Sequence, residues 1–214
     1  MFARIAIVLA LAVSLPARPA AAADQPVRIV ALGDSLTAGL GLPAEETFPA
    51  KLERALKAKG IAAEIVNAGV SGDTASGGLA RLEWSVPEGT DAVILELGAN
   101  DMLRGIDPSR TRQALEEIVR RLTERRIPVL LAGMRAAANL GGDYARDFAT
   151  IYSELAIGHD LLFYPFLLEG VAGEAGLNQS DGLHPSAAGV DAIVTRILPK
   201  VEELVRRARD KRVM

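Results

Sequence analysis

The chain has 214 residues, of which 50% are hydrophobic and 24% charged, and its net charge is −3. This composition is typical of a folded domain and excludes a disordered chain. Acidic and basic residues are interspersed without a basic face for nucleic acid, and the absence of cysteine excludes cysteine nucleophiles and thiolate metal sites.

The first segment, residues 1–23, has the pattern of a secretory signal peptide. Arg4 precedes a short apolar run, and Ala21-Ala22-Ala23 form an A-x-A cleavage site. A membrane-spanning helix needs about 20 apolar residues, so this run is too short to cross a bilayer stably. We expect a signal peptide over 1–23, one domain over 24–214 and a periplasmic or secreted protein. The alternative is an uncleaved membrane anchor.

Five apolar runs then alternate with helical patterns along the chain. The expected strands are "RIVALG", "AAEIVNAG", "DAVILELG", "IPVLLAGM" and "LLFYP". The expected helices cover residues 45–60 and 75–82, a segment capped by Asp107, residues 143–157, and a last helix that begins at Ser186 and bends or ends at Pro199. This alternation predicts an α/β fold, a three-layer α/β/α arrangement around a five-stranded parallel sheet of flavodoxin-like order.

Ligands of such sheets bind outside the carboxyl ends of the strands. Ser35 follows the first strand and is a candidate nucleophile, although a serine there is also a common helix N-cap. Gly72 and Asn100 follow the second and third strands. A glycine N–H and an asparagine amide could donate to an oxyanion, and ordinary turn residues are the alternative.

The candidate base is His184, which lies on the same edge three residues after Asp181. At this spacing the carboxylate could accept the Nδ1 proton and leave Nε2 free to activate a serine hydroxyl. A plain surface turn is the alternative for an isolated D-x-x-H. The other histidine of the mature chain, His159, is expected at the opposite edge of the sheet, as a surface or capping residue.

Four blocks of the chain resemble, in order, the motifs of the GDSL or SGNH hydrolases: "ALGDSLTAG", "NAGVSGDTASGGLARL", "LELGANDMLRG" and "SDGLHPSAAG". The sequence is most similar to the exported bacterial arylesterase, thioesterase and lysophospholipase branch. The resemblance implies that Ser35 is the nucleophile, His184 the base and Asp181 its partner. It also implies an oxyanion hole made by the N–H groups of Ser35 and Gly72 with the Asn100 side chain.

Two features depart from this pattern. In this branch the stretch after the fourth strand usually carries prolines and an aromatic residue, whereas here it reads "GMRAAANLGGDY". It would line the acyl pocket, so the substrate preference of the branch does not transfer directly. Glu96 is an acid in an apolar strand, and we favour a structural role for it over a place at the pocket edge.

The resulting hypothesis is hydrolysis of a small-molecule carboxylic ester or thioester through an acyl-enzyme on Ser35, with no metal and no cofactor. Two alternatives are a carbohydrate O-acetyl esterase of the same mechanism and a non-catalytic exported binding protein. The run Gly39–Ala44 fits the dinucleotide fingerprint G-x-G-x-x-A, but it lies too far beyond its strand and contains Pro43. We expect no nucleic-acid partner and no stable membrane span after cleavage, and the pattern leaves the oligomeric state open.

Overall fold

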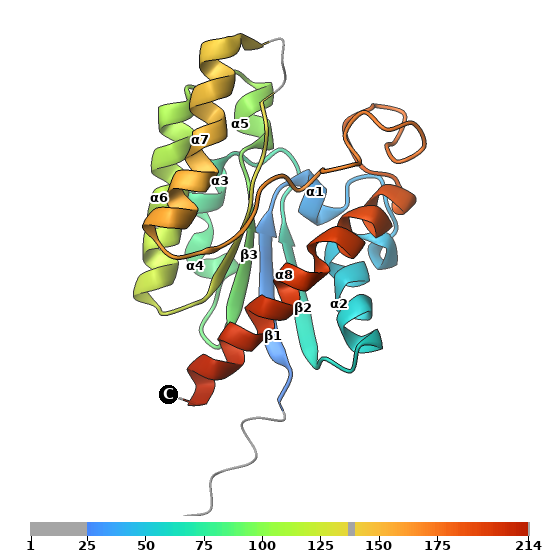
Figure 1. The fold of residues 1–214 in the computed structure, drawn as a ribbon, viewed down its shortest axis with the longest axis vertical. Helices are drawn as coiled ribbons and strands as arrows, with labels where there is room; N and C mark the ends of the chain where they lie inside the picture. Colours follow the sequence, from blue (N-terminus) through green and yellow to red (C-terminus); the bar gives the residue numbers. More distant parts are fainter. Residues whose placement is uncertain (1–24, 137–139, 214) are drawn as a thin grey trace, which may run out of the picture.

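The protein is described by a computed structural model that covers residues 25–136 and 140–213. A single parallel sheet lies at its centre, with strand order β2-β1-β3-β4-β5 (Figure 1). The strands are β1 (Val27–Gly33), β2 (Ala63–Gly69), β3 (Ala92–Glu96), β4 (Val129–Ala132) and β5 (Leu162–Tyr164). This arrangement confirms the predicted five-stranded flavodoxin-like sheet. The expected signal peptide over 1–23 lies outside the described residues.

Strand β1 is an interior strand of the sheet, because it pairs with both β2 and β3. Helices cover both of its faces, so its residues Ile29, Val30 and Leu32 are fully buried. This explains why β1 and β3 have continuous apolar sequences instead of alternating ones. The register pairs Gly33 with Gly69 on one side and with Glu96 on the other, which brings three loops side by side at one edge.

Helices flank the sheet in two layers (Figure 1). On one side α2 packs against α8, and on the other α6 contacts both α3 and α7. The helical elements are α1 (Ser35–Ala38), the 3₁₀ turn η2 (Ala44–Glu46), α2 (Phe48–Ala58), α3 (Ala75–Ala80), α4 (Leu82–Ser85), α5 (Ala99–Leu103), α6 (Pro108–Glu124), α7 (Gly142–Gly158) and α8 (Ala187–Val213). Within the described ranges no helix is long and apolar enough to span a membrane.

The sequence predicted that Pro199 bends or ends the last helix. It does not end the helix, since α8 continues to Val213. Proline removes one main-chain hydrogen bond from a helix interior, but Val201, Leu204 and Val205 beyond it are buried. Their burial against the rest of the protein outweighs the local cost of the proline. The start of α8 is as expected, because Ser186 Oγ accepts a hydrogen bond from the Gly189 N–H at 3.3 Å.

A matched pair of isoleucine substitutions tests this assignment of the core. Ile94 in β3 is 1% exposed, whereas Ile157 near the end of α7 is 83% exposed. Ile94→Ala should lower the free energy of unfolding by about 2–5 kcal/mol, because it leaves a cavity between the two helical layers. Ile157→Ala should change it by less than about 0.5 kcal/mol. Urea denaturation measures both, and equal effects would contradict the assignment.

Candidate active site

The candidate nucleophile lies in a sharp turn between β1 and α1. Ser35 is the first residue of α1, and the preceding Asp34 caps this helix by accepting a hydrogen bond from the Leu36 N–H at 3.0 Å. The turn also needs a glycine before it. A Cβ added at Gly33 would lie 2.1 Å from Thr37 Oγ1, far inside van der Waals contact. The strand therefore stops at Gly33 so that the next turn can fold back tightly and hold Ser35 at the sheet edge.

The predicted base and its partner meet this serine from the other end of the chain. His184 Nε2 lies 2.8 Å from Ser35 Oγ, and His184 Nδ1 lies 2.6 Å from Asp181 Oδ2. The other carboxylate oxygen, Oδ1, accepts hydrogen bonds from the main-chain N–H groups of Leu183 and His184. Hydrogen bonds from the main chain and the imidazole of His184 lower the pKa of Asp181 to about 2. The carboxylate is therefore ionised at neutral pH and fixes the imidazole with Nδ1 as the donor.

Gln179 joins the loop that carries Asp181 and His184 to the segment that follows α1. Its main-chain N–H donates to the carbonyl of His184 at 2.8 Å. Its side-chain amide donates to the carbonyls of Leu40 at 2.7 Å and Pro185 at 3.0 Å. Gly39 and Gly41, both with positive φ, shape the segment that receives this contact, and a Cβ at Gly41 would lie 2.2 Å from Gln179 Oε1. These glycines therefore serve the loop contact, in place of the nucleotide fingerprint that their spacing resembles.

The two predicted main-chain donors have free N–H groups. Ser35 is at the amino end of a helix, where N–H groups lack intrahelical partners, and Gly72 lies in a turn with φ of 85°. Within residues 25–136 and 140–213, neither N–H donates to another protein group. Both are thus available to an oxygen atom that enters from outside.

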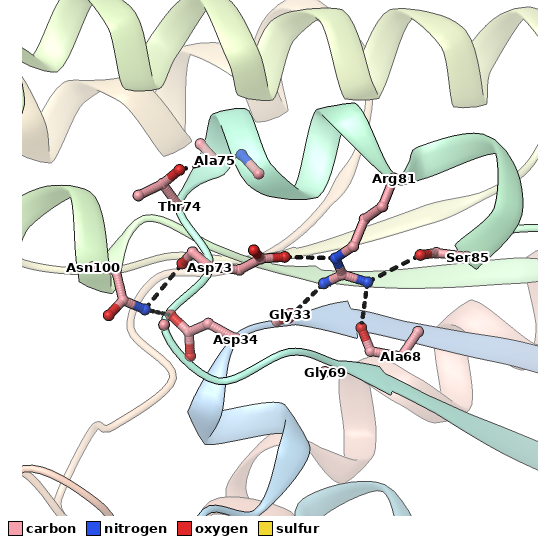
Figure 2. A network of polar contacts seen from close by, with 12 residues as sticks. Gly33, Asp34, Ala68, Gly69, Asp73, Thr74, Ala75, Arg81, Ser85 and Asn100 are labelled. Carbon is pink, nitrogen blue, oxygen red and sulfur yellow. Dashed lines mark hydrogen bonds and ion pairs between the residues drawn. The ribbon is translucent and has the colours of Figure 1, made fainter.

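Asn100 is already engaged, as Figure 2 shows. Its Nδ2 donates to Asp34 Oδ2 at 3.0 Å and to the main-chain carbonyl of Asp73 at 2.9 Å. The amide therefore bridges the loops that follow β1 and β2, and it lies on a short helix, α5, instead of the expected loop. To serve an oxyanion as well, one of its two N–H bonds must be shared with the entering oxygen.

Helix α5 is held by contacts at its start and at its third residue, Asp101. Gly98, with φ of 114°, turns the chain from β3 into the helix, and the Tyr152 hydroxyl donates to the Leu97 carbonyl at 2.9 Å. The buried Asp101 carboxylate accepts from the Ala75 N–H at 2.8 Å and from the Thr111 hydroxyl at 3.1 Å. These contacts fix Asn100 relative to α3 and α6.

Two buried carboxyl groups, Asp34 and Glu96, lie next to the turn that carries Ser35, and the sequence suggested a role, a structural one, for Glu96 alone. Burial raises the pKa of Asp34 to about 6, against the opposing hydrogen bonds from Leu36 and Asn100. Burial and the nearby charge of Asp34 raise the pKa of Glu96 well above its usual value. Glu96 Oε2 accepts from the Thr37 hydroxyl at 2.8 Å and the Asp34 N–H at 3.3 Å. Glu96 supports the turn from beneath, as the favoured structural interpretation required, and does not line the pocket.

An arginine also missed by the sequence analysis lies behind the site. The guanidinium of Arg81 contacts the Asp73 carboxylate and the ends of both β1 and β2 (Figure 2). Only its position eight residues after Asp73 was visible in the sequence, because its burial depends on how α3 packs. His159, by contrast, caps the carboxyl end of α7 before β5, at the edge remote from Ser35 as predicted.

An apolar cavity of about 340 Å³ opens beside the serine. Ser35, Asn100 and His184 contribute polar atoms to its wall. The apolar wall consists mainly of Leu36, Met102, Leu103, Met134, Phe166, Leu168 and Leu183. Arg135 also lines it, with its guanidinium 4.9 Å from the centre of the Phe166 ring and 3.3 Å from Glu169. In the part of the chain that the structure describes, no group of three His, Asp or Glu residues could hold a metal ion.

The raised pKa of Glu96 gives a pH-dependent stability. A carboxyl group whose pKa is raised by folding binds its proton more tightly in the native state, so stability falls as the pH rises above the unfolded-state pKa. Relative to Glu96→Gln, which cannot ionise, the wild-type free energy of unfolding should fall from about pH 4.5 upward. Urea titrations of both proteins at several pH values between 4 and 8 measure the difference. A difference independent of pH would show that Glu96 ionises freely.

Comparisons with known proteins identify the family of the chain. The profile of the GDSL-like Lipase/Acylhydrolase family matches residues 31–192. The chain is 36% identical to Esterase TesA of Pseudomonas aeruginosa, over 83% of this chain and 89% of that protein. It is also 36% identical to the Thioesterase 1/protease 1/lysophospholipase L1 of Escherichia coli K12, over 87% of each chain. The crystal structure of AlinE4, an SGNH-hydrolase family esterase, superposes with a TM-score of 0.71 at 47% identity and covers 84% of this chain and 96% of its own. The chain therefore belongs to the GDSL-like lipase and acylhydrolase family, whose members hydrolyse ester bonds.

Proposed function

We propose that this protein is a serine hydrolase that cleaves carboxylic esters or thioesters of small molecules through an acyl-enzyme on Ser35. One observation carries the proposal. The Ser35 hydroxyl, the His184 imidazole and the Asp181 carboxylate form a continuous chain, with 2.8 Å between Oγ and Nε2 and 2.6 Å between Nδ1 and Oδ2. A serine hydroxyl is a weak nucleophile without a base that removes its proton, and this chain supplies that base.

In the first step His184 Nε2 accepts the hydroxyl proton while Ser35 Oγ attacks the acyl carbonyl carbon. The carbonyl oxygen becomes an oxyanion, which accepts hydrogen bonds from the N–H groups of Ser35 and Gly72. Asn100 Nδ2 joins them by sharing one of its present bonds, to Asp34 or to the Asp73 carbonyl. Each such donor is worth about 3–4 kcal/mol in the transition state.

In the second step the imidazolium returns its proton to the leaving alcohol or thiol as the tetrahedral intermediate collapses. Asp181 stabilises the imidazolium, and its pKa of about 2 keeps it ionised throughout. Water then takes the place of the serine hydroxyl. His184 accepts a proton from this water, the acyl-enzyme is hydrolysed to the free acid, and Ser35 regains its proton.

The pocket supports an aliphatic or aromatic acyl group as the bound part of the substrate. Its wall is mostly apolar and includes Ser35, so an acyl chain bound there can extend from the reacting carbonyl along apolar side chains and lose contact with water. The apolar area that the acyl group buries contributes about 25 cal/mol per Å² to its binding. The pattern of residues 1–23 supports export to the periplasm or beyond, with the domain from Asp24 onward as the mature enzyme.

Substitution of the nucleophile tests the mechanism. Ser35→Ala should reduce the hydrolysis of p-nitrophenyl butyrate by at least about 10⁴-fold, since no other group can form the acyl-enzyme. It should also abolish labelling by a fluorophosphonate probe. Ser109→Ala, at an exposed position on α6, is the matched control and should keep both. Normal turnover by Ser35→Ala would refute the proposal.

A change in the pocket wall tests the acyl assignment. Met134 is 4% exposed and lines the cavity. Met134→Ala should deepen the pocket and shift the preferred substrate toward longer acyl chains. The measured quantity is the ratio of kcat/KM for p-nitrophenyl octanoate to that for the acetate, which should rise by about 3–10-fold, as expected for one or two additional buried methylene groups. An unchanged ratio would place the acyl chain elsewhere.

A further inference from the structure

We infer that Arg81 is a positioning residue that sets the relative placement of the three oxyanion donors, Ser35, Gly72 and Asn100. The inference rests on the proposed function, because it concerns the same oxyanion. Arg81 does not line the cavity beside Ser35, so it acts through main-chain and carboxylate contacts and not by touching the substrate. Figure 2 shows these contacts.

The guanidinium is buried, and each of its three nitrogen atoms donates a hydrogen bond. Arg81 is 7% exposed, and it lies where α3 passes into α4. Its Nε donates to Asp73 Oδ2 at 2.5 Å, and its Nη2 donates to the Gly33 carbonyl at 2.8 Å. Its Nη1 donates to the Ala68 carbonyl at 2.8 Å and to the Ser85 hydroxyl at 2.9 Å. One planar group thus connects a carboxylate and the ends of two neighbouring strands.

The contact with Gly33 fixes the first donor. The Gly33 carbonyl is the last of β1, two residues before Ser35, and it also accepts from the Val70 N–H at 3.0 Å. Arg81 and Val70 therefore hold the same carbonyl from two sides. A displacement of this carbonyl would tilt the turn that presents the Ser35 N–H.

The contact with Asp73 fixes the other two donors. Asp73 follows Gly72 directly, and its main-chain carbonyl accepts from Asn100 Nδ2 at 2.9 Å. Its carboxylate is held by Arg81 on one side and borders α3 on the other, where a Cβ at Gly77 would lie 2.6 Å from Asp73 Oδ1. The orientation of this one residue therefore sets both the direction of the Gly72 N–H and the place of the Asn100 amide.

The geometry requires an arginine. Its guanidinium presents five donors in a fixed plane, whereas a lysine ammonium presents three donors around one point. The acceptors on Gly33, Ala68 and Asp73 are contacted by three different nitrogen atoms of Arg81. An ammonium at one point cannot reach all of them, so Arg81→Lys should keep the charge and lose the alignment.

Arg212 provides a matched control at the opposite edge of the sheet. Its guanidinium contacts the Asp91 carboxylate and the main-chain carbonyls of Gln25 and Pro26. It thus joins the end of α8 to the start of β1 by the same chemistry, far from the oxyanion donors. Arg212→Lys should affect stability alone.

The experiment compares Arg81→Lys and Arg212→Lys by steady-state kinetics on p-nitrophenyl butyrate, with thermal unfolding measured in parallel. Arg81→Lys should lower kcat by about 10–100-fold with KM within about threefold, because the loss falls on transition-state contacts. The acid limb of its pH–rate profile should stay at the wild-type position, since Arg81 contacts neither His184 nor Asp181. Arg212→Lys should keep kcat within about twofold of wild type, even if it lowers the unfolding midpoint by as much as Arg81→Lys does.

A double variant covers the case in which Arg81→Lys does not fold. Arg81→Met with Asp73→Asn removes both charges and leaves no unpaired buried carboxylate, and its kcat should also fall by about 10-fold or more. The inference is overturned if kcat of the folded single or double variant stays within about twofold of wild type. It is equally overturned if KM rises while kcat is unchanged. Turnover by Ser35→Ala would instead refute the proposed function, whatever the Arg81 variants do.

Discussion

The parallel pairing of β1 with both β2 and β3 is the constraint on which the site depends. In the register of the sheet, Gly33 is opposite Gly69 and Glu96, so the three following loops leave the same edge as neighbours. Each loop contributes one of the proposed oxyanion donors: Ser35, Gly72 or Asn100. Their spacing is inherited from the fixed distance of about 4.8 Å between adjacent strands. Short turns after the three strands are therefore enough to place the donors around Ser35. The proposed base, His184, comes from a more distant part of the chain.

Several charged side chains are buried around these donors, whereas the core of a protein is usually apolar. Asp34, Glu96 and Asp101 are at most 1% exposed, and Arg81 is 7% exposed. Burial of an unpaired charge is costly, and the protein limits this cost in two ways. Arg81 pairs with Asp73 and the Asp34 carboxylate accepts hydrogen bonds from Leu36 and Asn100, while the raised pKa of Glu96 favours its neutral form. The network stabilises one arrangement of the loops more than it stabilises the fold, which is the behaviour expected of a pre-organised site.

The sequence was sufficient for the architecture and for the residues that meet at the edge of the sheet. Continuous apolar runs identified the strands, and the loops after them contained the candidate site residues. The structure brings Ser35, Asp181 and His184 into contact and places Gly72 and Asn100 on the neighbouring segments. Arg81 and Asp34 were missed because their importance lies in burial and in partners 48 and 66 residues away, which no local pattern records. Glu96 was visible as an acid in an apolar strand, but its raised pKa results from burial and from the nearby charge of Asp34, which depend on the folded structure. Likewise, α8 continues past Pro199 because residues beyond the proline are buried against the rest of the protein.

The distance of 149 positions between Ser35 and His184 along the chain has a consequence for biosynthesis. A ribosome releases the amino-terminal part first, so the serine emerges well before its histidine exists. During that interval the hydroxyl has no group to remove its proton and is chemically inert. A truncated translation product that stops before the final helix lacks either the imidazole or the buried face that anchors it. Under the proposed mechanism, hydrolysis therefore requires a complete and folded chain.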